Sequence, residues 1–327
     1  MPTSPGVGPR RIRRPTIAEP GDVHYATASS RSSGYDYRAP MTRVGAVIKR
    51  TVPPESVAAL AADAAPGLDE LWIIEDLDWA GGISQLLAVL HATDNDAAGR
   101  PLVAHGIAPA PFRNPAALAM EWATLARMHP GRVIGGIGHG VPEWMRRLGA
   151  QVDSPLTLLR ETIESTVAVL SGERITYEGR YVSIADVELE FPPTQPVPVV
   201  AGVTGPKSLR LSGEVADGTV IAEGFGPARL LEARSLIDEG RAAAGRTEPH
   251  HMSVFTGFYC GDLALLPPPP PTVVDGFAAV GSDPSSVAAE LQTIVDAGAD
   301  SLIILPFGPD LEQIRRFVDE VAPLLVL

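Results

Sequence analysis

Short apolar runs rich in β-branched residues alternate with longer stretches of helical periodicity over most of the chain. This alternation is typical of repeated strand–helix units around a parallel sheet. The runs predict eight strands, at residues 43–48, 70–74, 102–107, 132–137, 197–201, 218–222, 252–259 and 301–305. Helices are predicted after them, at residues 54–65, 83–91, 115–128, 156–170, 206–215, 227–243, 284–297 and 311–324. Eight such units favour a closed α/β fold, a single (β/α)8 TIM barrel, over an open sheet.

Residues 173–193 do not fit a strand–helix unit. The sequence around Gly179 predicts two short strands about a turn, which we interpret as an insertion before the fifth strand. Four predicted helices carry proline in the first turn, where a missing N–H costs little: Pro115, Pro206, Pro227 and Pro284.

Two segments interrupt the pattern. Residues 1–40 are rich in proline, serine, glycine and arginine and have no hydrophobic periodicity, so we expect a disordered N-terminal extension and a barrel domain at residues 41–327. A start codon placed too early, with Met41 as the true start, is the alternative. The proline run at residues 267–271 is expected in a surface loop.

Composition narrows the class of protein. Hydrophobic residues make up 45% of the 327 residues and charged residues 20%, as in a globular enzyme with a sizeable core. A net charge of −13 argues against a nucleic-acid partner, and no apolar run is long enough to predict a membrane span. A single cysteine, Cys260, excludes an internal disulfide, and a signal-peptide core is absent, so a cytoplasmic location is expected.

In barrels of this kind the active site lies where the strands run into the following loops. The second strand ends at Glu75 and Asp76, whose side chains should point to opposite faces, so at most one should face a pocket. Glu75 is expected to accept backbone N–H bonds of the next loop. His139 lies in a glycine loop and stays open as a site residue, whereas His250 and His251 are expected at the surface.

Two glycine-rich loops are candidate cofactor sites. Residues 202–208 join glycine-rich backbone to a helix start and would present free N–H groups to a phosphate, although an ordinary strand-to-helix turn explains the glycines equally well. Residues 135–140 lack the spacing of a dinucleotide fingerprint and are better suited to bring a flat ring close to the backbone. The sequence contains no metal-ligand motif, so no metal site is expected.

Together these segments resemble the luciferase-like monooxygenase superfamily, especially its branch of deazaflavin-dependent reductases such as methylenetetrahydromethanopterin reductase. The resemblance runs from about Thr42 to the C-terminus. Order and spacing make it specific. The segments that show the resemblance are residues 71–76, 113–115, 123–126, 130–140, 170–173, 179–181, 198–202, 205–209 and 216–218.

The resemblance implies a role for particular residues. Gly106-Ile107 matches a non-prolyl cis peptide that forms a bulge behind the central ring of the cofactor, and Asp76 matches an acidic position near the cofactor head. The phosphate contacts of the family map onto the backbone around Thr204 and Gly205. The expected cofactor-binding residues are therefore Gly106, Ile107, Gly138, Gly140, Gly202, Thr204, Gly205 and Lys207, and Asp76 and His139 are the expected catalytic residues.

The chain departs from the sugar-phosphate dehydrogenases of this branch at two positions. They have histidine after the acid, where this chain has Leu77, and glutamate after the fourth-strand glycines, where it has Val141. Oxidation of a hydroxyl that needs this histidine as base is therefore disfavoured. The interpretations as a reductase or a monooxygenase are favoured instead.

We therefore expect an enzyme that transfers a hydride between a bound deazaflavin, coenzyme F420 (8-hydroxy-5-deazaflavin), and a small organic substrate. Two alternatives stay open. One is an FMN-dependent monooxygenase that uses oxygen and a separate flavin reductase; the other is a flavin-binding protein without turnover. A homodimer also stays open, and the loops that choose a substrate are too variable to identify it.

Overall fold

The computed structural model describes residues 41–94, 100–268 and 276–327. The predicted N-terminal extension, residues 1–40, and the last prolines of the predicted loop lie outside these residues. No described helix is long and apolar enough to cross a bilayer.

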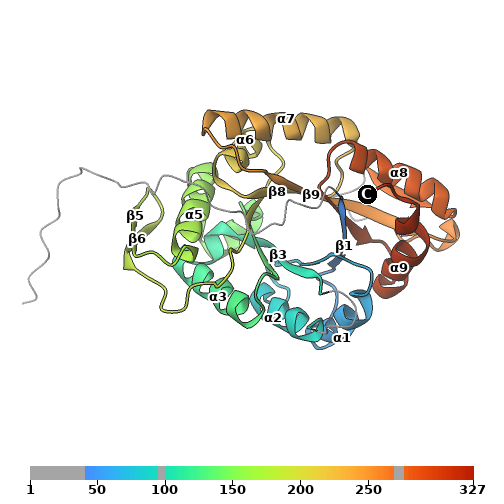
Figure 1. Cartoon of the computed structure of the whole chain (residues 1–327), viewed down its shortest axis with the longest axis horizontal. Helices are drawn as coiled ribbons and strands as arrows, with labels where there is room; N and C mark the ends of the chain where they lie inside the picture. The colour runs from blue at the N-terminus through green and yellow to red at the C-terminus, as the bar shows by residue number, and fades with distance from the viewer. Residues whose placement is uncertain (1–40, 95–99, 269–275) are drawn as a thin grey trace, which may run out of the picture. The chain divides into compact units, whose positions relative to one another are not determined.

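Eight parallel strands close into a barrel, as the sequence predicts (Figure 1). Neighbours pair in the order β9-β11-β1-β2-β3-β4-β7-β8, and β8 pairs with β9 to complete the ring. The barrel strands are β1 (Arg43–Ile48), β2 (Glu70–Ile73), β3 (Leu102–Pro109), β4 (Val133–Gly138), β7 (Val199–Gly202), β8 (Gly218–Ile221), β9 (His251–Cys260) and β11 (Ser301–Pro306).

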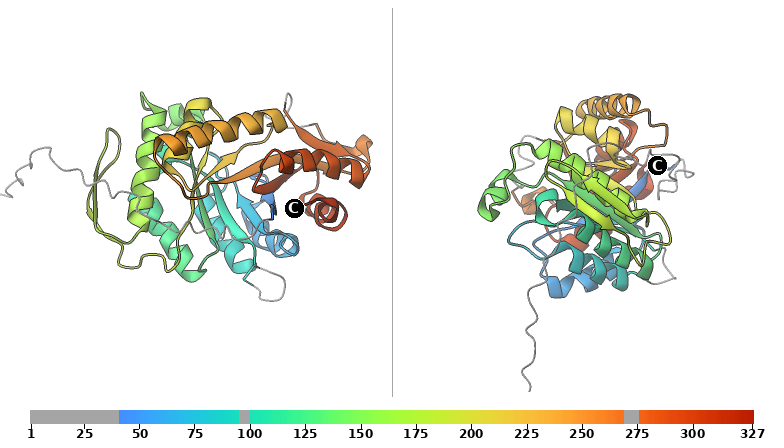
Figure 2. Two further views of the ribbon diagram at one scale, coloured as in Figure 1. Left: turned by 45° about the horizontal axis from the view of Figure 1, so that its top comes forward. Right: turned by 90° about the vertical axis from the view of Figure 1, so that its left-hand side faces the viewer.

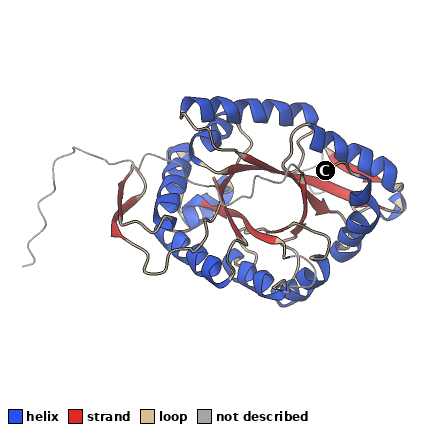
Figure 3. Cartoon of the chain, in the orientation of Figure 1, coloured by secondary structure: helices blue, strands red, loops and turns tan. Residues whose placement is uncertain are grey.

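Helices surround this ring on the outside (Figure 3). They are α1 (Pro54–Ala64), α2 (Gly82–Ala92), α3 (Pro115–Met128), α4 (Pro142–Leu148), α5 (Pro155–Leu170), α6 (Pro206–Val215), α7 (Pro227–Ala243), α8 (Pro284–Asp296) and α9 (Asp310–Arg316). The four predicted proline starts are confirmed, at α3, α6, α7 and α8. The last predicted helix ends as a regular α-helix at Arg316 and continues in irregular helical turns to Leu324.

The insertion before the fifth barrel strand is a β-hairpin, formed by β5 (Ile175–Glu178) and β6 (Ser183–Val187). It lies outside the ring beside α5 in both Figure 1 and Figure 2. The buried carboxylate of Glu161 on α5 accepts the backbone N–H groups of Arg180, Tyr181 and Val182 at 2.7, 2.7 and 2.9 Å. One side chain therefore fixes the turn of the hairpin to the barrel.

A short strand that the sequence did not reveal, β10 (Ala278–Gly281), pairs with the carboxyl half of β9. The amino half of β9, His251 to Val254, pairs with β8. The β8–β9 ladder thus ends at Ile221 and Val254, and β9 runs on beyond the ring next to β10.

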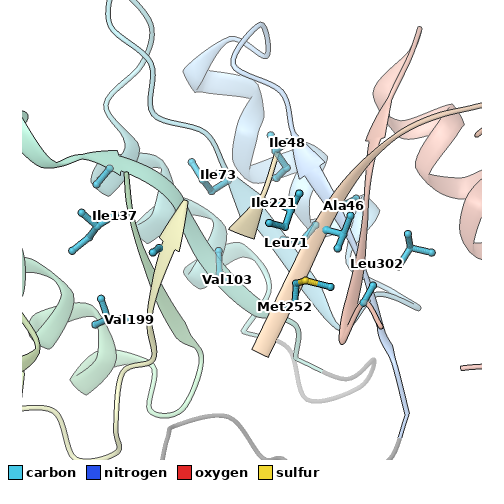
Figure 4. Packing of buried hydrophobic residues seen from close by; sticks show 14 of the residues in the cluster. Ala46, Ile48, Leu71, Ile73, Val103, Ile137, Val199, Ile221, Met252 and Leu302 are labelled. Carbon is cyan, nitrogen blue, oxygen red and sulfur yellow. The ribbon is translucent and has the colours of Figure 1, made fainter. Parts of the chain in front are cut away.

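Strand alternation divides the apolar side chains into two cores. One fills the barrel interior and contains Val47, Trp72, Ala104, Ile134, Val200, Val220, Phe255 and Ile303. The other lies between strands and helices, and Figure 4 shows part of it, including Ile48, Leu71 and Val103. Successive strand residues therefore alternate between the two cores, for example Leu71 and Trp72.

A buried polar network lies at the amino end of the barrel and corrects the surface position expected for two histidines. His251 Nε2 lies 2.7 Å from Ser301 Oγ, which donates to Glu70 Oε1 at 2.7 Å, and His250 Nε2 lies 2.8 Å from Thr219 Oγ1. Burial lowers the pKa of both histidines, that of His251 to about 4. Neutral imidazoles with hydroxyl partners can be buried at little cost. The apolar periodicity of the sequence does not show where such polar residues are buried.

Candidate active site at the carboxyl ends of the barrel strands

The Gly106–Ile107 peptide is cis, as the family resemblance implies. The register of β3 against β4 shifts between His105 and Ala108, so the strand bulges at this point. A side chain at Gly138 or Gly202 would overlap Ile107: a Cβ on Gly138 would lie 2.9 Å from Ile107 Cγ2. The ends of β4 and β7 thus need glycine because the Ile107 side chain lies across them.

Gly106 has no room for a side chain, because Trp72 lies against it. A Cβ on this residue would overlap the six-membered ring of Trp72, which belongs to the interior core. The bulge therefore rests directly on that core. Ile74, Ile107 and Leu305 are partly buried and pack on the same core, so the floor beneath the strand ends is apolar.

A buried ionic network lies behind the bulge. The Glu75 carboxylate accepts two hydrogen bonds from Arg113, both 2.6 Å, and one from the Gly82 backbone N–H at 3.0 Å. Its Oε2 also lies 3.2 Å from His105 Nε2, and Trp122 Nε1 donates to His105 Nδ1 at 3.2 Å. Burial alone would raise the pKa of Glu75, but the partners His105 and Arg113 outweigh it and hold the pKa well below its usual range.

The expected role of Glu75 as acceptor for the next loop is therefore confirmed. Sequence reasoning missed Arg113 and His105 as its partners. The Arg113-Asn114-Pro115 motif was a signal for Arg113, but a pairing over 38 residues requires the fold to be known.

Asp76 points elsewhere, as the alternation of adjacent side chains predicts. Its carboxylate pairs with Arg50, from the loop after β1, and the Arg50 guanidinium carbon lies 5.4 Å from the centroid of the Trp79 ring. Asp76 thus sits at the strand ends as a paired anion. Lys49, next to Arg50, pairs with Asp310 at 2.5 Å.

His139 links the loop after β4 to the first turn of α6. Its Nε2 lies 2.8 Å from Ser208 Oγ, and burial lowers the pKa of the imidazole. The neutral ring therefore holds the third residue of α6 in place. The structure thus brings His139 next to the segment that contains Thr204, Gly205 and Lys207.

The amino end of α6 is exposed and open. Gly205 precedes Pro206 at the helix start, and a Cβ on Gly205 would meet no atom within 4 Å. No side chain in the described part of the chain caps this helix, and Thr204 and Lys207 are exposed. Free backbone N–H groups and the helix dipole at such an end favour an anion.

The helix α4 after β4 escaped prediction because seven residues are too few to show a helical period. Gly140 and Gly149, both with positive φ, stand on either side of it. Met145 is buried against Gly140, and Arg147 forms two hydrogen bonds to Asp78, at 2.6 and 2.9 Å. The loops after β2 and β4 are thus joined at the same end of the barrel as the candidate site. No group of described residues could hold a metal ion.

Comparisons with known proteins bear on this site. A profile of the family described as luciferase-like monooxygenase matches residues 38–263. An F420-dependent glucose-6-phosphate dehydrogenase of Microbacterium testaceum is 30% identical over 69% of this chain and 79% of its own.

Two archaeal reductases are also similar. The 5,10-methylenetetrahydromethanopterin reductase of Methanolobus tindarius is 29% identical over 58% of this chain and 55% of its own length. The coenzyme F420-dependent tetrahydromethanopterin reductase of Methanopyrus kandleri superposes with a TM-score of 0.74 at 19% identity, covering 87% of this chain and 99% of that one.

Proposed function

Because the chain belongs to the luciferase-like monooxygenase family, we propose that it transfers a hydride between coenzyme F420 and a small organic substrate. The observation that carries the proposal is the Ile107 bulge, lying across Gly138 and Gly202 beside the open end of α6. The wall for a flat ring, on β3, and the site for a phosphate, after β7, are thereby separated only by β4.

The phosphate end of the cofactor fits α6. Gly205 faces open space, and Thr204, Gly205 and Lys207 would supply backbone N–H groups and one ammonium group. Gly202, at the base of this loop, would let the Ile107 wall lie directly against the end of β7.

The acidic tail of F420 needs further cations on the same side. Arg229 on α7 has no carboxylate partner among the described residues, and its guanidinium carbon lies 3.8 Å from the centroid of the Phe225 ring. Arg210 pairs with Glu239 at 2.7 Å and is therefore less suited to the tail. Lys207 and Arg229 are the residues that we assign to it.

The ring end of the cofactor fits the strand ends. Gly106 and Ile107 would form the wall behind the ring, and Gly138 and Gly140 on the β4 side leave room for the Ile107 and Met145 side chains. When bound, F420 supplies a carbon centre that donates or accepts a hydride. The apolar floor of Ile74, Ile107 and Leu305 would exclude water from that centre.

Two polar residues have different roles in this proposal. Asp76, held by Arg50, would accept a hydrogen bond from the cofactor head or the substrate. His139 is neutral and bonded to Ser208, so we assign it to positioning the α6 loop. With Leu77 and Val141 replacing the polar residues of the sugar-phosphate dehydrogenases, reduction of the substrate is the favoured direction.

The test is anaerobic turnover with reduced F420 deuterated at the carbon that donates the hydride. We expect the deuterium to appear in the reduced product without oxygen. Turnover only with reduced FMN and oxygen would establish a monooxygenase instead, and tight binding without any turnover would establish a carrier.

A further inference from the structure

We propose that the substrate is an uncharged and largely apolar compound, an inference that rests on the proposed function. The cations around the carboxyl ends of the strands decide which charge a substrate can carry. A phosphate or carboxylate on a substrate would need at least one cation there that is free to bind it.

The described loops after β1, β3 and β4, with α4, supply five lysine and arginine side chains, and each already has a carboxylate partner. The pairs are Lys49–Asp310, Arg50–Asp76, Arg113–Glu75, Arg146–Glu143 and Arg147–Asp78. Lys49 also donates to the Gly308 carbonyl at 2.9 Å, and Arg113 and Arg147 bind their partners through two hydrogen bonds each.

Among the described cations that follow the carboxyl ends of the strands, Lys207 and Arg229 have no carboxylate partner. Both lie in the first turn of a helix on the β7 and β8 side, where we place the phosphate and tail of the cofactor. Glu223, in the loop after β8, has no cation within ion-pair distance among the described residues. Once the cofactor is bound, the remaining unpaired charge is therefore negative.

An anionic substrate would have to separate an existing pair. The Lys49–Asp310 pair is partly buried, with side chains 25% and 12% exposed. Burial raises the pKa of Asp310, so this carboxylate is already poorly solvated, and loss of Lys49 would leave it without its counter-charge. The pairs therefore select against anions, and the apolar residues beside the Ile107 wall, Ile74 and Leu305, select for apolar surface.

This geometry points to an uncharged carbonyl, imine or electron-poor alkene as the reacting group. Its electron-poor carbon takes the hydride, with both electrons, from reduced F420, which becomes oxidised F420. The other atom of the double bond takes one proton from solvent. The sugar phosphate that the Microbacterium testaceum relative is named for falls outside this class.

The experiment uses the full chain. Titration of F420 alone is the first arm, and absence of binding there contradicts the proposed function, not the inference. The second arm titrates cyclohexanone and 2-cyclohexenone, and the same rings carrying a carboxylate, into the F420-loaded protein and follows the cofactor spectrum. We expect the carboxylates to bind at least tenfold more weakly. Equal affinities, binding of glucose-6-phosphate as tight as that of the ketones, or no binding of either neutral ring overturns the inference.

Variants separate local pairing from the overall negative charge. Asp310→Asn frees Lys49, and Asp238→Asn frees Arg241 on α7; both raise the net charge by one. We expect Asp310→Asn to reduce the ratio of the affinity for the neutral rings to that for the carboxylates about fivefold. Asp238→Asn should leave this ratio unchanged. If Asp310→Asn fails to fold, Asp78→Asn takes its place, because it frees Arg147. Asp78 has a left-handed backbone conformation, which asparagine tolerates. If the variant at the carboxyl ends of the strands and the Asp238→Asn control give equal affinity ratios, the inference is overturned.

Discussion

Glu75 combines a buried charge with contacts to three segments: Arg113, Gly82 and the strand residue before the bulge, His105. Replacing Glu75 by glutamine keeps the shape and removes the charge that Arg113 needs. We expect the free energy of unfolding to fall by about 2 to 3 kcal/mol, below the ~3–5 kcal/mol of a fully buried pair because Arg113 is partly exposed.

Urea denaturation measures this change, with Glu143→Gln as the control. Glu143 pairs with Arg146 at the surface, and its loss should leave stability almost unaltered. Equal effects of the two substitutions would show that the Glu75 network contributes no more than a surface pair.

His251 gives a prediction for pH. Burial lowers its pKa to about 4 in the folded chain, whereas the ordinary value is 6.5. As the pH falls below about 6.5 the unfolded chain takes up a proton that the folded chain does not, so the free energy of unfolding decreases towards pH 4, by about 3 kcal/mol in all. In His251→Gln this part of the slope should disappear. An unchanged slope between pH 6.5 and 4 would show that His251 is protonated in the folded state.

At the residue scale the sequence predicts positions better than partners. The separation of Glu75 from Asp76 followed from strand alternation, and the cis peptide at Gly106–Ile107 followed from the family resemblance. The partners of Glu75, His139 and His251 come from distant segments, so local patterns do not contain them. Burial of His251 was mispredicted because its partner Ser301 lies 50 residues away.

Removal of a single charged side chain from helix α6 tests the cofactor proposal. Lys207→Met should weaken F420 binding about five- to tenfold, with the loss shrinking at high salt, because an exposed charge pair is screened. Arg210→Met is the matched control on the same helix, since Arg210 is already paired with Glu239. Isothermal titration calorimetry decides it: losses of equal size would mean that general charge, not the α6 end, governs binding.

Long elements were predictable because their apolar period is repeated several times. The ranges of α3, α6 and α7 agree with the structure at both ends, and proline at their first position marks each start. The seven-residue α4 and four-residue β10 carry too few positions to show a period. The end of α9 differs because its regular turn gives way to wider and tighter turns after Arg316.

For the whole molecule, the barrel closes within the described residues, from β1 to β11. We therefore propose that residues 41–327 are the functional domain. A chain that begins at Met41 should keep the thermal midpoint and the F420 affinity of the full chain. A loss of affinity with the midpoint retained would assign residues 1–40 a part in the site.

The fold could be predicted from the alternation of short and long apolar periods, because eight strand–helix units leave few closed arrangements. Chemistry required more. Many activities share this fold, and the distinguishing features here are side-chain pairs such as Lys49–Asp310 and Arg50–Asp76, which form only when the strand ends meet.

The central claim is that F420 is the bound cofactor, and titration of F420 and FMN into the apo-protein at low and high salt tests it most directly. Both ligands offer a three-ring head and a phosphate, so the Ile107 wall and the α6 end serve either one. Lys207 and Arg229 distinguish them through the acidic tail of F420. We predict that F420 binds more tightly by about 1 to 2 kcal/mol at low salt, with a smaller advantage at high salt. Equal affinities, or a preference for FMN at both salts, would contradict the account.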